Sequence, residues 1–450
     1  MNQILKIIET ELKEVNFLIK HISQLKVAMH FPFKKINWFT NNDFDLFRSL
    51  ISSTKSDKDA HKKIESKLKY NCPNLLKNHE DFCKNLIAIA TTNNLRCKYE
   101  IKYFEDILKI KTKPLINFYE YHYLYQLLLT FGHFNLAFLV RQHIYASAKK
   151  ENFLLRFSYR YIKMLYFIIE AGDITKFNAK LKNLYYYNSN CKFLLILLSI
   201  LLFRKNNSDL LDKKSNNEFS RNFFNKIYNK DVILIGPKKT YADKSKNKKK
   251  HSKVIATINF TDINFYSDLI YFNDYSIKYI SETFLRKSLS NKNTNFLIFK
   301  NERSLNNYIK IKKSFNFIGS SVEIRNSLSF DSIVSGDLNM GVISALDIIS
   351  ANPRSLKLKN FDLMLTRKRT TSYYLESKYL QEREKIYVIK SFIQHDPLTQ
   401  YFILSTLLKN KKIKCDANLN NILEGGPRLY MSRLEKVYGK SARINMDKIS

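Results

Sequence analysis

The residue best suited to acid–base chemistry in the C-terminal half of this sequence is a histidine. Only two of the nine histidines lie in that half, and one of them, His251, is inside the lysine-rich run KSKNKKKHSK. The other, His395, follows the apolar run YVIKSFI and precedes a helix predicted to begin at Pro397 or Leu398. Since an imidazole takes up and releases a proton near neutral pH, His395 is the candidate general base. The alternative is a histidine that caps the helix or lies on the surface.

A second group of candidates consists of glycine and polar residues at predicted strand ends and helix starts. In a doubly wound α/β sheet, ligands bind beyond the carboxyl ends of the strands, where backbone N–H groups and helix N-termini favour phosphate. The residues at such positions are Gly236, Pro237, Asn259, Asn273, Ser335 and Gly336. Each of them alone also fits a turn or a cap, so the hypothesis of a phosphate site depends on their occurring together.

Short apolar runs that alternate with helical stretches position these residues. The first run, DVILIGPKK, is rich in β-branched residues and ends in Gly-Pro, which predicts a buried strand and a tight turn. Further runs cover residues 253–260, 268–273, 294–300, 316–320 and 355–365, with helices expected over 281–288 and 340–350. This alternation predicts a mostly parallel sheet covered by helices, an α/β Rossmann-like domain over residues 231–450.

The N-terminal half has a different pattern. Residues 1–205 show helical periodicity, almost no glycine and no convincing alternating strand. Two segments share an apolar helix, a turn at Gly132 or Gly172 and a second amphipathic helix, and the two glycines are 40 residues apart. This spacing predicts an all-α domain of stacked helical hairpins, of the tetratricopeptide (TPR-like) type. Residues 206–230 are polar and charged, and we interpret them as a linker.

The order of the C-terminal motifs resembles that of the bacterial sialyltransferases of glycosyltransferase family 42. The first strand of that family runs into a Gly-Asn-Gly-Pro-Ser-Leu loop, its next strands end in asparagines, a Thr-Ser-Gly precedes a long helix, and Gly-Ile/Phe-Asp ends a later strand. Its catalytic histidine opens a helix with the pattern H-x-x-x-T/Q, similar to HDPLTQYFILSTLLKNKKIKCD here. The matching residues are Gly236, Pro237, Asn259, Asn273, Ser335, Gly336, Phe361, Asp362 and His395.

The resemblance covers roughly residues 231–416 and includes departures. Leu234, Ile235 and Lys238 stand where the family's signature loop has glycine, asparagine and serine. Of the two tyrosines that bind the leaving phosphate in the family, the first position is similar to Met364. Tyr373 or Tyr374 is the candidate for the second.

The resemblance implies a GT-A-type, sialyltransferase-like catalytic domain and an inverting transfer reaction. His395 would remove the proton from an acceptor hydroxyl as that oxygen attacks the anomeric carbon, and CMP would leave. Tyr373, Tyr374, Lys238 and Arg367 are candidates for stabilising its phosphate, so the scheme needs no metal and no cofactor besides the CMP-sugar donor. The donor would be CMP-sialic acid or a related acidic sugar, and the acceptor a cell-surface glycan.

Composition restricts the partners and the location. The formal net charge is +36, which makes an anionic membrane surface a candidate partner, although drift in an A+T-rich genome would also load the surface with lysine. The five cysteines form no CxxC pair, and we see no signal peptide and no apolar run long enough to span a bilayer. We therefore expect a cytoplasmic protein, with peripheral contact at the inner face of the membrane as an option.

Two further hypotheses compete with the transferase. One is a non-catalytic helical-repeat scaffold with a degenerate nucleotide-binding domain, which the altered loop and tyrosine positions would permit. The other is a nucleic-acid binder, prompted by the charge; it lacks a recognisable motif, so no specific nucleic acid is expected as a partner. The DxD string that begins at Asp43 lies in the helical half, where a surface or cap position is the expected explanation.

Overall fold

The computed structural model of this protein describes a core of helices and strands in both halves of the chain. The described residues are 62, 65–66, 69, 118–150, 218–237, 253–258, 267–273, 294–300, 302–314, 322–327, 338–365, 392 and 395–439. The described helices are α7 (Phe118–Phe131), α8 (Phe134–Lys150), α13 (Glu218–Ile227), α16 (Glu302–Ser314), α17 (Met340–Ser350), α20 (Pro397–Lys409), α21 (Ala417–Glu424) and α22 (Gly426–Tyr438). The described strands are β1 (Asp231–Ile235), β2 (Lys253–Ile258), β3 (Leu269–Phe272), β4 (Phe296–Phe299), β5 (Glu323–Asn326), β6 (Ser355–Lys359) and β7 (Lys414–Cys415).

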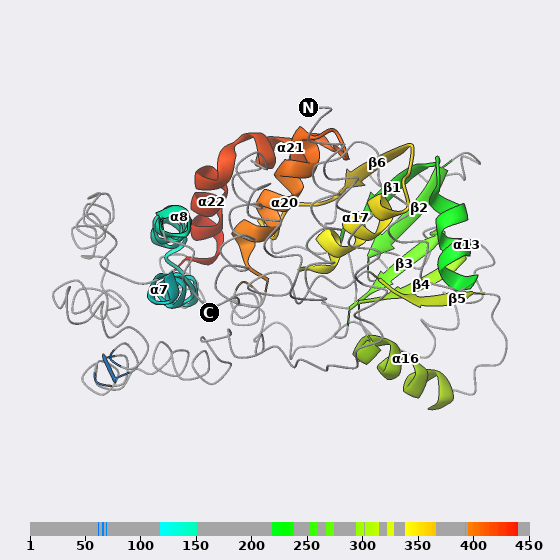
Figure 1. Ribbon diagram of the computed structural model, residues 1–450, viewed down its shortest axis with the longest axis horizontal. Helices are drawn as coiled ribbons and strands as arrows, with labels where there is room; N and C mark the ends of the chain where they lie inside the picture. Colours follow the sequence, from blue (N-terminus) through cyan, green and yellow to red (C-terminus); the bar gives the residue numbers. More distant parts are fainter. Residues whose placement is uncertain are drawn as a thin grey trace, which may run out of the picture.

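The described strands form one seven-stranded sheet in the order β5-β4-β3-β2-β1-β6-β7 (Figure 1). All of its strand pairs are parallel. Strands β2 to β5 follow one another on one side of β1. The chain then crosses back, and β6 and β7 lie on the other side of β1. The predicted parallel sheet covered by helices is therefore confirmed and is consistent with a Rossmann-like fold, and its strand order reverses between β1 and β6.

The central strands are buried apolar segments, as expected for a parallel sheet covered on both faces. Every residue of β3 and β4 is buried, and β1, β2 and β6 were predicted from their apolar runs. Strand β5, with the sequence EIRN, was not predicted, because its polar residues do not form an apolar run. Among the described strands β5 lies at the edge of the sheet, beside β4, and charged residues are common on edge strands.

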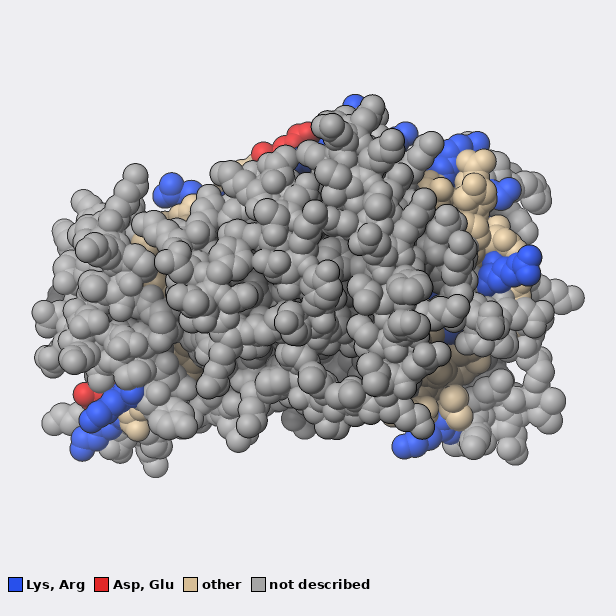
Figure 2. All heavy atoms as spheres, viewed as in Figure 1, with Lys and Arg blue, Asp and Glu red and all other residues tan. Residues whose placement is uncertain are grey.

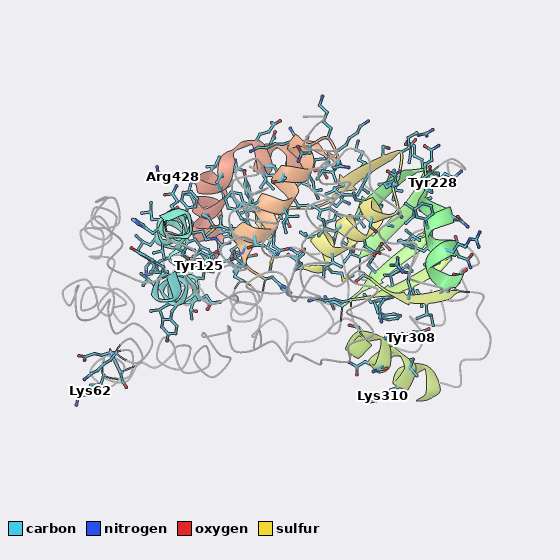
Figure 3. All side chains as sticks on the ribbon, in the orientation of Figure 1. Lys62, Tyr125, Tyr228, Tyr308, Lys310 and Arg428 are labelled. Carbon is cyan, nitrogen blue, oxygen red and sulfur yellow. The ribbon has the colours of Figure 1, made fainter. Side chains whose placement is uncertain are left out.

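Side-chain alternation shows that helices cover both faces of the sheet. Phe296 of β4 packs edge-to-face on Phe223 of α13, whereas Phe299, three residues on, contacts Tyr308 of α16. Positions three residues apart in a strand point to opposite faces. Helices α13 and α16 thus lie on opposite faces, and Tyr308 points from α16 toward the sheet (Figure 3).

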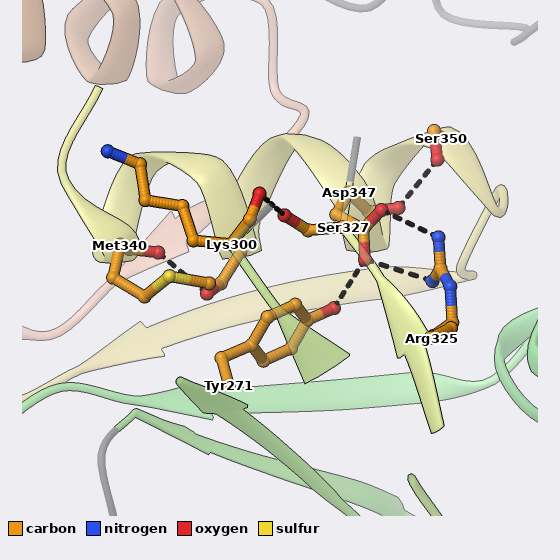
Figure 4. A network of polar contacts seen from close by, with 8 residues as sticks. Tyr271, Lys300, Arg325, Ser327, Met340, Asp347 and Ser350 are labelled. Carbon is orange, nitrogen blue, oxygen red and sulfur yellow. Dashed lines mark hydrogen bonds and ion pairs between the residues drawn. The ribbon is translucent and has the colours of Figure 1, made fainter. Parts of the chain in front are cut away.

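Helix α17 lies on the same face as α13 and was predicted with the correct bounds. Ten of its eleven residues are buried, which agrees with its almost uniformly apolar sequence, MGVISALDIIS. Its one charged residue, Asp347, accepts hydrogen bonds from Tyr271 of β3 (2.9 Å) and from both terminal nitrogens of Arg325 of β5 (3.1 Å each; Figure 4). The helix is buried on all sides because its single charge is neutralised inside the fold.

Helices α7 and α8 form the predicted hairpin with its turn at Gly132. The glycine has a φ of +80°, a left-handed conformation that other residues adopt only with strain. The two helices pack on each other and α8 packs on α22, so the hairpin is joined to the C-terminal helices (Figure 1). The other elements of the predicted helical domain, including the turn at Gly172, lie outside the described residues.

The C-terminal end of the predicted linker belongs to the α/β unit. Residues 218–227 of the 206–230 segment form α13, whose Phe223 and Ile227 are buried. A short amphipathic helix rich in polar residues resembles a linker in composition, and its two apolar anchors are the feature that distinguishes it. The predicted strand at 316–320 and the predicted helix at 281–288 lie outside the described residues.

Candidate functional site

The sheet itself indicates where a ligand would bind. In open parallel sheets, ligands bind beyond the carboxyl ends of the strands at the point where the strand order reverses. Here that point lies between β1 and β6. The chain leaves β1 through Gly236 and Pro237, and it leaves β6 through Asn360 and Phe361. These two strand ends form the floor of the candidate site.

Phe361 holds this floor together by packing against two glycines. A Cβ atom on Gly236 would lie 2.7 Å from the carbonyl oxygen of Asn360 and 3.0 Å from the Phe361 ring. A Cβ atom on Gly341, in the first turn of α17, would lie 2.6 Å from the same ring. Only glycine fits at either position without displacing its neighbours. The ends of β1 and β6 and the start of α17 therefore converge on one phenylalanine.

The loop after β6 has an unusual backbone. Asn360, Leu363 and Met364 have φ angles of 60°, 48° and 68°, in the left-handed region that costs energy for residues other than glycine. Asp362 accepts a hydrogen bond from the backbone N–H of Met364 (3.0 Å). Strained loops of this kind occur at ligand sites when the surrounding structure holds them in place.

Helix α22 holds this loop through two tyrosines. Tyr430 donates its hydroxyl proton to the carbonyl of Leu363 (2.9 Å), and Tyr438 donates to the carbonyl of Met364 (2.8 Å). Burial, followed by the nearby charge of Asp362, raises the pKa of Tyr430 well above its ordinary value. Both hydroxyls are donated to the backbone, so these two tyrosines stabilise the loop and do not substitute for the phosphate-binding tyrosines of the resembled family.

The N-termini of α17 and α20 meet at the same edge of the sheet. Asn339 caps α17 by accepting from the backbone N–H of Val342 (2.9 Å), and its own N–H donates to Oε1 of Gln400 (3.1 Å). Gln400 is in the first turn of α20 and is 97% buried, yet its Nε2 has no hydrogen-bond partner among the described residues. A buried amide with a spare donor beside two helix N-termini is suited to an anionic ligand.

His395 stands immediately before α20, at this meeting point. The next residue, Asp396, caps α20 by accepting from the backbone N–H groups of Leu398 (3.0 Å) and Thr399 (3.2 Å). His395 is partly exposed, whereas Asp396 is buried. The predicted base is therefore positioned by a rigid, capped helix start, on the edge of the sheet where a substrate would bind.

The predicted residues fall into two groups. Gly236, Pro237, Phe361, Asp362 and His395 lie on the described carboxyl edge near the β1–β6 reversal, and Asn273 follows β3 on the same edge. With β2 between β3 and β1, Asn273 is two strand spacings, about 10 Å, from the end of β1. The other predicted positions lie outside the described residues: Asn259, Ser335, Gly336, Tyr373, Tyr374, Lys238 and Arg367.

Several residues of this edge were not predicted from the sequence. Asp396 followed by Pro397 is a helix-start signal that could have revealed the cap of α20. Lys300, which follows β4 and is 7% exposed, brings a buried positive charge to the same edge. No local signal marks Gln400, because its role depends on the approach of α17, about sixty residues earlier in the chain.

The described surface adds little to the interpretation of the net charge. On the face drawn in Figure 2, the described Lys and Arg side chains lie in several separate groups rather than in one patch. Within the described residues, no group of three or more His, Cys, Asp or Glu could hold a metal ion. No described helix has the length and apolarity needed to cross a membrane.

Comparison of the chain with known proteins gives no further guide to its function. No protein-family model, no curated protein and no solved structure matches it.

Proposed function

We propose that this protein is an inverting glycosyltransferase that transfers sialic acid or a related acidic sugar from a CMP-activated donor to a glycan. One observation carries the proposal: His395 lies at the start of α20, which the Gln400–Asn339 hydrogen bond joins to the start of α17. Both helices begin on the carboxyl edge of the sheet, where the strand order reverses between β1 and β6. A base and two helix N-termini are thus close to the crevice where a nucleotide would bind.

The donor site of this proposal uses the floor made by Gly236 and Phe361. The bare backbone at Gly236 lets a nucleotide approach the sheet closely, and the N-termini of α17 and α20 offer partial positive charge to its phosphate. The spare amide donor of Gln400 suits the same group. Asn259, Asn273, Ser335 and Gly336 complete the nucleotide contacts on the strength of the resemblance, and Tyr373, Tyr374, Lys238 and Arg367 remain candidates for the leaving phosphate.

In the proposed reaction, the imidazole of His395 accepts the proton of an acceptor hydroxyl. The hydroxyl oxygen forms a bond to the anomeric carbon as the bond from that carbon to the phosphate oxygen breaks. The configuration inverts, because attack and departure occur on opposite sides. The negative charge moves to the phosphate of CMP, where hydroxyl and cationic donors stabilise it.

The biological setting follows from the resemblance. A cell-surface glycan as acceptor and a cytoplasmic location, with contact at the inner face of the membrane, agree with a transferase that builds surface polysaccharide or lipooligosaccharide. The positive net charge suits both an acidic donor sugar and anionic lipid.

Calorimetric titration with CMP tests the proposal first. The purified protein is titrated with CMP and, in parallel, with UMP, AMP and GMP. Selective binding of CMP supports the transferase, and transfer is then assayed with CMP-sialic acid and a panel of glycan acceptors. Absence of binding for all four nucleotides would contradict it.

The second candidate function is a non-catalytic scaffold with a degenerate nucleotide-binding domain. The observation that favours it is the apolar end of β1, where Leu234 and Ile235 are buried in the sheet at positions that carry glycine and asparagine in the resembled family. A scaffold would bind no nucleotide, and His395→Ala would leave its partner binding unchanged.

A further inference from the structure

The carboxylate next to the candidate base has four hydrogen-bond donors, two of them from the distant helical hairpin. Asp396 accepts from the backbone N–H groups of Leu398 and Thr399, which belong to its own helix. It also accepts from the hydroxyl of Tyr125 on α7 (2.8 Å) and from Nη1 of Arg141 on α8 (2.8 Å). The cap of α20 is therefore shared between the α/β unit and the hairpin.

Arg141 is held on several sides at this junction. Its side chain is 2% exposed, and its second terminal nitrogen donates to the hydroxyl of Thr399 (3.1 Å). The guanidinium group also lies over the ring of Tyr125, 5.2 Å from its centre. A buried arginine needs a charge partner and further hydrogen bonds to offset its desolvation, and Asp396 and Thr399 supply them. The fork of the guanidinium thus determines where the first turn of α20 lies.

Two further contacts of the hairpin do not involve Asp396. The backbone N–H of Asn135, near the start of α8, donates to Glu435 of α22 (2.7 Å). Phe134 packs edge-to-face on Phe392 (5.3 Å between ring centres). These contacts hold the hairpin without touching Asp396, so the Tyr125–Arg141 pair is not needed merely to attach it.

We propose that Tyr125 and Arg141 are positioning residues for His395 and act through Asp396, so that docking of the α7–α8 hairpin completes the candidate active site. This inference rests on the proposed role of His395 as base. The peptide bond between His395 and Asp396 is fixed on one side by the four hydrogen bonds to the Asp396 carboxylate. When Arg141 is removed, a buried carboxylate loses its counter-charge, and the turn that carries His395 moves to rehydrate it.

The first test observes His395 directly. Full-length protein carrying isotope-labelled histidine is compared by NMR, and the His395 imidazole signal is assigned as the one absent from His395→Asn. Arg141→Met and Tyr125→Phe should both shift this signal from its wild-type position. Glu435→Ala, which removes a hairpin contact away from Asp396, is the matched control and should leave the signal unshifted.

The second test measures the consequence for turnover. With the donor and acceptor found for the wild type, Arg141→Met should lower kcat by about 10- to 100-fold, the range expected when a catalytic group is displaced by about an ångström. The affinity for CMP should fall by a smaller factor than kcat, because Arg141 reaches the proposed nucleotide site only through the start of α20. Arg141→Lys, which keeps the charge but not the fork, should recover part of kcat.

The two tests separate the inference from the proposed function. A His395 signal unchanged in both Arg141→Met and Tyr125→Phe would overturn the inference, as would a kcat within about twofold of wild type in Arg141→Met. If the wild type binds no CMP, the proposed function fails, and the NMR shift still decides whether the hairpin positions His395. If Arg141→Met does not fold, the milder Tyr125→Phe decides the outcome.

Discussion

Two buried aspartates of this protein have the same kinds of partner in different parts of the fold. Asp347 accepts from Tyr271 and from Arg325, all three within the sheet and the helix that covers it. Asp396 accepts from Tyr125 and from Arg141, whose position in the sequence is 255 residues earlier. The Asp347 triad lies within the α/β unit. The Asp396 triad joins the α/β unit to the α7–α8 hairpin beside the candidate base.

The difference shows how one arrangement of side chains can serve two purposes. At Asp347 the charges neutralise each other in the middle of a buried helix (Figure 4). At Asp396 the same chemistry lies at a helix N-terminus on the carboxyl edge of the sheet, where ligands bind in this class of fold. We therefore expect changes at Asp347 to affect stability alone, and changes around Asp396 to affect both stability and turnover.

The largest effect is expected at His395, which lies next to Asp396 and has no counterpart in the Asp347 triad. His395→Ala should lower kcat by about 100- to 10,000-fold, the usual contribution of a general base, and should leave CMP affinity and thermal stability near wild type. Steady-state kinetics and calorimetric titration on the same preparation measure both quantities. Wild-type turnover in His395→Ala would contradict a catalytic role for the region around Asp396.

The next largest effect is expected on stability, at the Asp347 triad. Arg325→Met should lower the free energy of unfolding by about 3–5 kcal/mol, because it leaves the charge of Asp347 buried without its cation. Urea unfolding measures this loss. The double variant Asp347→Leu/Arg325→Met should recover much of it, since a well-packed apolar pair avoids the desolvation cost. An equally unstable double variant would show that the triad stabilises the fold by more than charge compensation.

A matched pair of tyrosine variants compares the two regions directly. Tyr271→Phe and Tyr125→Phe each remove one hydroxyl that donates to a buried carboxylate, and each should cost about 1.5–3 kcal/mol of stability. Only Tyr125→Phe should also lower kcat. Urea unfolding and initial-rate assays on both variants test this contrast, which breaks if Tyr271→Phe lowers turnover as much as Tyr125→Phe does.

The smallest effect is expected at the exposed ion pair between Arg354 and Asp231, which lies at the amino ends of β1 and β6. Hydrogen bonds from Arg354 and Ser355 lower the pKa of Asp231 below its ordinary value. Its contribution to stability is therefore present above about pH 4 and is lost as the pH falls toward the lower folded-state pKa. Asp231→Asn should lose less stability than wild type between pH 7 and pH 3 in urea unfolding. Identical losses would show that this surface pair contributes nothing measurable.

Local patterns in the sequence predicted those elements whose structure is decided by nearby residues. The apolar runs at β1, β2, β3, β4 and β6 correspond to buried strands, and the start of α17 was predicted correctly. The start of α20 and the turn at Gly132 were also predicted, because a proline at a helix start and a glycine between two apolar helices act over a few residues.

Predictions were incomplete where a residue's environment comes from distant parts of the chain. Strand β5 is polar and exists because the edge of β4 pairs with it, and α13 in the predicted linker is held by two apolar side chains on the sheet. No local sequence pattern indicates the hydrogen bond from Tyr125 to Asp396. The same holds for the hydrogen bond from Asn339 to Gln400. Such contacts depend on the packing of whole elements, which short-range periodicity does not encode.

By itself, then, the sequence determined the class of fold, the bounds of its most apolar elements and the choice of His395 as candidate base. Only the tertiary structure decided that the strand order reverses between β1 and β6 and that the α7–α8 hairpin supplies two of the four donors to Asp396. The tendency of a segment to form a helix or a strand follows from neighbouring residues. The order of strands and the partner of a buried charge follow from which surfaces exclude water together, and that is a property of the whole chain.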